Sequence, residues 1–186
     1  MKRRTTLQLG ITTGLVLLTG CTGGGSSSPD YATDGNDEDP IQADANSLLL
    51  TQDAANEVVG GDWSRSEPHE SSIVTRGTDA SAGLYSTSED GPAGWITVGV
   101  WLFDTVDGAR EAFDGHGYQS GYGFEDREIA VESIAGAVDG NEGVALFRDA
   151  NAMGAVSRTD PKGSDDEHID MALALGVAMH STWRSG

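Results

Sequence analysis

The sequence predicts one α+β domain, in which an antiparallel sheet built from repeated strand-strand-helix units carries helices packed on it. Three observations predict this fold class. Residues 95–103 alternate in the manner of a strand, residues 143–148 and 152–158 form two strands around a short turn, and residues 167–183 form a long apolar helix. The domain is expected to span residues 46–186, which is enough chain for one hydrophobic core.

An export signal is predicted at the start of the chain. A basic beginning that includes Arg3 and Arg4 precedes an apolar stretch at residues 7–18, which is too short to span a bilayer. Small residues then lead into Cys21, the only cysteine. With that cysteine assigned to the signal, we expect no disulfide, thiolate metal site or cysteine nucleophile in the domain.

Residues 18–21, Leu-Thr-Gly-Cys, resemble the lipobox of secreted lipoproteins at every position. Arg3 and Arg4 with the residues that follow resemble the twin-arginine motif of proteins exported already folded. The resemblance implies a signal peptide over residues 1–20 and a lipid on the Cys21 sulfur. It places the protein at the cell membrane, held by the lipid and facing outward.

Residues 21–45 are expected to form a disordered tether, because Gly, Ser, Asp and Pro fill most of them. The acidic run at residues 34–39 is only superficially like a calcium loop. The EF-hand pattern needs Gly at its sixth position and Glu at its twelfth, where this chain has Asp39 and Ala45. We therefore expect no metal site there.

The charge balance excludes some partners. All 30 acidic residues lie after Gly20 with only eight basic residues, so the mature chain would carry a formal net charge of −22. Such a surface repels nucleic acid and anionic lipid headgroups. Acid-rich chains with one lysine, here Lys162, resemble proteins of extreme halophiles, and twin-arginine lipoproteins are abundant in haloarchaea. The alternative is an acidic protein from an ordinary organism.

The first half of the domain is predicted as one helix, three strands and a second helix. Thr51 caps a helix at residues 52–59, and two short strands follow at residues 73–76 and 82–86. Residues 95–103 are apolar on both faces, which indicates a central strand covered on each side. The second helix follows at once and is expected to be capped by Asp104.

The second half is predicted as three strands and a helix. The strands lie near residues 128–131, at 143–148 and at 152–158, and the helix runs from Glu167 to about Trp183. Its middle, residues 171–179, is apolar all round. Burial between the sheet and another layer explains this, and contact of one face with a ligand or partner is the alternative.

Two short sequence segments in the domain resemble segments of other exported lipoproteins. Residues 48–51 followed by 61–63, and residues 100–104 followed by 109–113, are similar to mycobacterial LpqN-like lipoproteins and to the extracellular sensor domains of some bacterial kinases. The resemblance implies an α+β fold over about 120 residues. It carries no catalytic motif.

The candidate binding residues are aromatic. The glycine-rich stretch after the second helix departs from a dinucleotide fingerprint and is predicted to be a loop. Tyr118, Tyr122 and Phe124 would form an aromatic lip over a pocket, and Trp101 would line that pocket or belong to the core. The scattered histidines predict no metal site, and no cofactor is expected.

These observations favour a non-catalytic module that binds a small apolar ligand, senses it, or docks an envelope partner. A second class is an enzyme that hydrolyses its substrate with Asp and Glu. The sequence has no motif that pairs a nucleophile with a base, which argues against an enzyme. A purely structural cell-surface protein is a third.

The mature charge predicts that folding depends on salt. Below roughly 1 M salt, where the Debye length exceeds about 3 Å, repulsion among the carboxylates should unfold the domain. Circular dichroism before and after dialysis to low salt measures this. A spectrum that does not change would contradict the halophilic interpretation.

Overall fold

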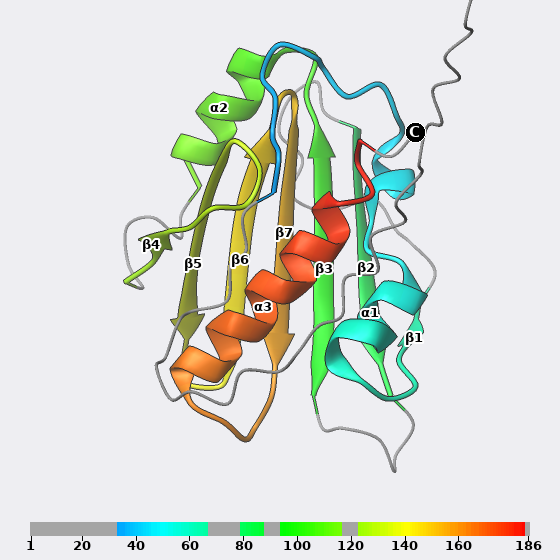
Figure 1. Cartoon of the computed structure of the whole chain (residues 1–186), viewed down its shortest axis with the longest axis vertical. Helices are drawn as coiled ribbons and strands as arrows, with labels where there is room; N and C mark the ends of the chain where they lie inside the picture. Colours follow the sequence, from blue (N-terminus) through cyan, green and yellow to red (C-terminus); the bar gives the residue numbers. More distant parts are fainter. Residues whose placement is uncertain (1–32, 67–78, 88–93, 117–122, 185–186) are drawn as a thin grey trace, which may run out of the picture.

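The computed structural model describes residues 33–66, 79–87, 94–116 and 123–184 (Figure 1). The predicted export signal with Arg3 and Arg4, the predicted lipid-anchor residue Cys21 and the predicted strand at residues 73–76 lie outside these residues.

Within the described residues, seven strands form one antiparallel sheet in the order β1-β2-β3-β7-β6-β5-β4. The strands are β1 (Ser64–Arg65), β2 (Asp79–Ser86), β3 (Trp95–Leu102), β4 (Glu125–Asp126), β5 (Glu132–Val138), β6 (Glu142–Asp149) and β7 (Ala152–Thr159). The helices are the 3₁₀ turn η1 (Ala45–Leu48), α1 (Gln52–Val59), α2 (Val106–Asp114) and α3 (Asp165–His180). The predicted α+β class is confirmed.

Strand β3 lies inside the sheet, between β2 and β7, and contributes to two core clusters, one on each face. The larger cluster, on the face toward α3, takes up one side of the strand: Ile96, Val98, Val100 and Leu102. On the opposite face Trp101 is buried in a second cluster under α2, whereas Trp95 at the other end is 51% exposed. The prediction of cover on both sides therefore holds for only one end of the strand.

Helix α3 packs on the sheet against β5, β6 and β7, with α1 beside it (Figure 1). A capping box formed by Ser164 and Glu167 begins it, which satisfies backbone groups that the first turn leaves unpaired. Leu173, Leu175 and Met179 are among its residues buried in the larger cluster. Burial explains this part of the helix surface, whereas Met171, Val177 and Ala178 are only half-buried, so contact of that side with a ligand or partner stays a prediction.

Two predicted boundaries are wrong. Helix α2 is capped by Thr105, whose hydroxyl accepts from the Gly108 amide, and not by Asp104. Residues 128–131 are not a strand, because Ala130 has a φ of 57°, which breaks extended pairing. Strand β5 begins at Glu132, directly after the end of the predicted strand.

The close approach of α3 to β6 depends on a glycine in the strand. A Cβ on Gly143 would lie 1.9 Å from the backbone oxygen of His168, at the start of the helix. A side chain there is possible only if the helix shifts away from the sheet.

We expect Gly143→Ala to lower the free energy of unfolding by about 3 kcal/mol, because it forces backbone apart in a packed core. Chemical denaturation at constant high salt measures it. Gly83→Ala is the control, since its Cβ would meet side-chain atoms of Arg65 and Val98 no closer than 3.3 Å. Equal losses in the two variants would contradict this account of the packing.

Candidate functional site

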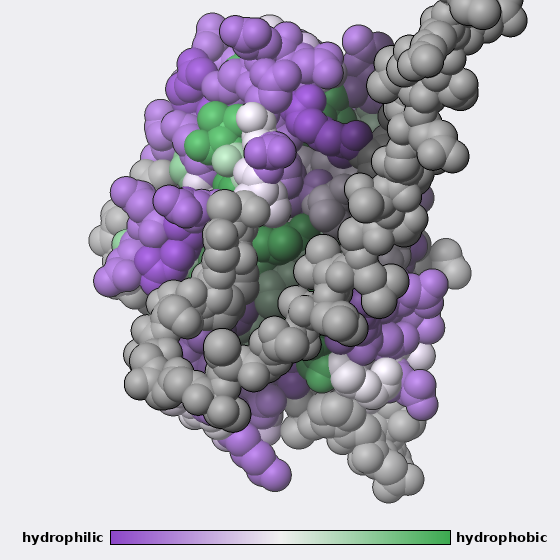
Figure 2. Space-filling view, viewed as in Figure 1, coloured by the Kyte–Doolittle hydropathy of each residue, from purple (hydrophilic) through white to green (hydrophobic). Residues whose placement is uncertain are grey.

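A cleft of about 540 Å³ lies between the end of α2 and the β4–β5 edge of the sheet. It is lined by Phe113, Asp114, Phe124, Asp126, Arg127, Val131, Glu132, Ser133 and Ile134. Hydrophilic residues dominate the visible surface of α2 and β4 (Figure 2). The cleft therefore joins an apolar interior to a charged rim.

The apolar part of the cleft continues into the smaller core cluster. Phe113 and Ile134 belong to that cluster together with Trp101, and Phe124 packs against it. The Phe124 ring lies over Gly136, where a Cβ would come within 2.6 Å of the ring. A glycine in β5 thus makes room for the aromatic wall.

The structure brings two of the four predicted aromatic residues together. Phe124 lines the cleft, and Trp101 lies beneath it, 4% exposed and packed over Gly99. Trp101 is therefore a supporting residue and not a lining one. Tyr118 and Tyr122 lie outside the described residues, so their part in an aromatic lip stays a prediction.

Sequence reasoning missed the remaining walls of the cleft. Phe113 was visible as part of an apolar helix stripe, but nothing local shows that α2 covers the β5 side of the sheet. Glu132 and Ile134 are not predicted as lining residues, because the predicted strand at residues 128–131 ends before them. The register of β5 is the signal that would have found them.

The rim of the cleft carries more carboxylates than cations. Arg127 is paired with Glu125 at 3.0 Å, beside the cleft. Asp114 is the last residue of α2, at the end of the helix where the dipole is negative. With Asp126 and Glu132, this leaves the rim favourable to positive charge.

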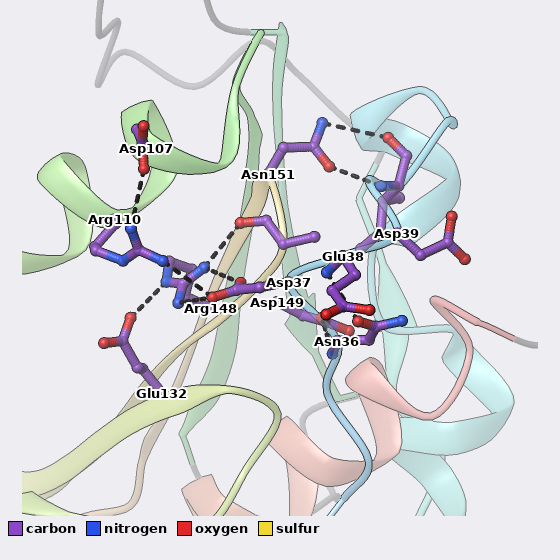
Figure 3. A network of polar contacts seen from close by, with 12 residues as sticks. Asn36, Asp37, Glu38, Asp39, Asp107, Arg110, Glu132, Arg148, Asp149 and Asn151 are labelled. Atoms are coloured by element: carbon purple, nitrogen blue, oxygen red, sulfur yellow. Dashed lines mark hydrogen bonds and ion pairs between the residues drawn. The ribbon is translucent and has the colours of Figure 1, made fainter.

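One rim carboxylate also belongs to a buried ion-pair network (Figure 3). Arg148 on β6 is 1% exposed, and its Nε donates to Glu132 Oε2 at 2.5 Å. Its Nη1 donates to Asp37 Oδ1 at 2.6 Å and to the Ala150 carbonyl at 3.0 Å. Arg110 of α2 donates to the other Asp37 oxygen at 3.1 Å.

Asp37 belongs to a segment that the sequence assigned to the tether. Residues 33–41, here called the strap, pack against the β6–β7 hairpin and the start of β5. Thr33 Oγ1 accepts from the Ala130 amide at 2.8 Å, and the Ile41 amide donates to Asn151 Oδ1 at 2.7 Å. The packed body therefore includes residues 33–45, because their polar groups have partners in the sheet.

A second buried carboxylate holds the middle of the strap. Asp149 is fully buried and accepts from the Asn36 amide at 2.8 Å. Its carboxylate also accepts from Nε and Nη2 of Arg184, both at 2.7 Å, and from His180 Nε2 at 2.8 Å. The strap, the hairpin and the end of α3 meet at this one group.

Both carboxylates are held ionised, with a pKa below the ordinary 3.8. The hydrogen bond from Arg148 is the main cause for Asp37, and it outweighs the opposing effect of burial. For Asp149 burial is the largest influence and would raise the pKa, but the hydrogen bonds from Arg184, His180 and the Asn36 amide together outweigh it.

Another groove, of about 650 Å³, lies between α1 and α3. Its polar residues are largely engaged in holding the start of α3. Arg158 pairs with Asp160 at 3.2 Å, and His168 Nε2 lies 3.0 Å from the Lys162 carbonyl. We therefore favour the cleft beside α2 as the candidate site.

No protein-family model matches the chain, and no curated protein matches it. Among solved structures, the extracellular domain of PknH from Mycobacterium tuberculosis is similar, with a TM-score of 0.52 and 12% identity. The likeness covers 78% of this chain and 98% of that chain. It shows a shared fold, that of an extracellular domain.

Two further observations concern the described residues. None of their helices is long and apolar enough to cross a membrane. In that part of the chain, no group of three or more His, Cys, Asp or Glu side chains is arranged to hold a metal ion.

The two low-pKa carboxylates predict acid sensitivity. A group whose pKa is lower in the folded state stabilises the fold above its unfolded pKa and loses that contribution as the pH falls. Stability should therefore decrease below about pH 4. Asp149→Asn should lose about 3 kcal/mol at pH 7 and depend less on pH between 4 and 2.

Denaturation at fixed salt and varied pH measures both effects. Asp107→Asn is the control, because Asp107 is 92% exposed and pairs only with Arg110 on its own helix. An Asp149→Asn variant with the acid sensitivity of the unchanged protein would contradict this account of the network.

Proposed function

We propose that this chain is a lipoprotein, anchored to the outside of the cell membrane through Cys21, whose domain binds a small ligand without catalysis. The observation that carries the proposal is the cleft beside α2, where half-buried Phe124 and exposed Val131 offer apolar atoms over the buried Phe113 and Ile134, next to a charged rim. A small molecule with an apolar body fits such a site. The lipobox-like sequence and the fold shared with an extracellular domain support the location.

The enzyme alternative would place the chemistry on rim carboxylates. To act as a general acid or base, Glu132 would have to give up the hydrogen bond that its Oε2 accepts from Arg148 Nε at 2.5 Å. Asp114 and Asp126 would have to act as the pair. A structural or docking role would instead use exposed apolar residues such as Trp95 and Leu84, which are 51% and 42% exposed.

The test is to identify what the cleft carries. The full chain with Cys21→Ser would be expressed at high salt, recovered without its lipid, and extracted with solvent for mass spectrometry. A specific molecule near one per chain is the expected result. Retention of this variant in the membrane fraction would contradict the lipid anchor.

Phe124→Ala should remove the bound molecule, because the ring forms one wall of the cleft. Trp95→Ala is the control, an aromatic truncation at the start of β3, outside the cleft. If both variants keep the molecule, the cleft is not its site. Empty extracts from every preparation would favour partner docking or a structural role.

A further inference from the structure

Arg148 connects the cleft to the strap. Glu132 lines the cleft and also accepts from Arg148, while Asp37 of the strap accepts from the other side of the same guanidinium. Of the two carboxylates, Asp37 is 30% exposed and Glu132 is 38% exposed, whereas Arg148 is 1% exposed. The cation is therefore fixed in the body, and its partners are the movable groups.

Two carboxylates that share one buried cation oppose one another. The two carboxylates repel one another, and at Arg148 either one supplies the negative charge that the guanidinium needs. Arg110 also donates to Asp37, at 3.1 Å, but does not contact Glu132 among the hydrogen bonds of the described residues. Removing charge from Glu132 should leave Arg148 dependent on Asp37. Opening the strap would then strand a buried guanidinium with no counter-charge, which makes opening less favourable.

We propose that Arg148 couples the cleft to the strap, so that a ligand bringing a positive group to Glu132 strengthens the docking of residues 33–41. The inference rests on the proposed function for its ligand. The rim carboxylates of Asp114, Asp126 and Glu132, beside an Arg127 already paired with Glu125, indicate a cationic group. Binding of the ligand in the cleft would in this way change how tightly the strap is docked, and so affect the part of the chain that precedes it.

The coupling can be tested without the ligand, because Glu132→Gln imitates a neutralised Glu132. The Asn36 and Ile41 amides donate to Asp149 and Asn151, so their hydrogen exchange reports strap opening. We expect Glu132→Gln to slow this exchange by about fivefold, a coupling typical of contacting charged groups. Amides of the β3–β7 pair provide the reference for global unfolding.

Two variants separate coupling from a general loss of charge. Glu125→Gln removes one carboxylate from the same edge of the sheet, where it pairs with Arg127, and should leave strap exchange unchanged. Asp37→Asn should speed strap exchange. Adding Glu132→Gln to Asp37→Asn should no longer slow it, because the strap then has no charge to offer Arg148.

Faster or unchanged exchange in Glu132→Gln, with the core amides still protected, would overturn the coupling. So would an equal slowing in Glu125→Gln. These outcomes do not test the proposed function. That proposal is tested by whether Phe124→Ala loses the bound molecule. Conversely, empty extracts would leave a coupling measured in Glu132→Gln intact.

Discussion

A guanidinium with almost no exposed surface has to be neutralised where it lies, and much of this protein is arranged around that requirement. Arg148 on β6 donates hydrogen bonds to Asp37 of the strap, to Glu132 of β5 and to the Ala150 carbonyl of the hairpin. Arg110 of α2 also donates to Asp37. Removing the charge of Arg148 would leave these groups facing one another across a buried space. The docking of the strap and the position of the cleft wall thus have a common cause.

Elements with local signals could be predicted from the sequence. The alternation of β3, the hairpin of β6 and β7, and helix α1 with its Thr51 cap all lie where the residue pattern indicated. The strap could not be predicted in this way. Its acidic residues have the composition of a linker, and the partner of Asp37 is 111 residues away in the chain.

The candidate site was predictable only in part, for a related reason. Phe124 can be predicted because it follows a stretch of sequence that is rich in glycine and tyrosine. To predict that Phe113 lines the cleft, one must know which face of the sheet α2 covers. To predict the same of Ile134, one must know the register of β5. Both depend on long-range packing, to which short-range periodicity is insensitive.

The meeting of strap and C-terminal residues at Asp149 has a mechanical consequence. Arg184 Nη2 donates to the Asn36 carbonyl at 2.7 Å, across a sequence separation of 148 residues, so the strap and the residue that follows α3 by four positions are held together. A pull on Thr33 would load its contact with the Ala130 amide first, and then the contacts of Asn36 with Asp149 and Arg184. The long β3–β7 seam would carry little of that tension, so the sheet would stay intact while the strap peeled away.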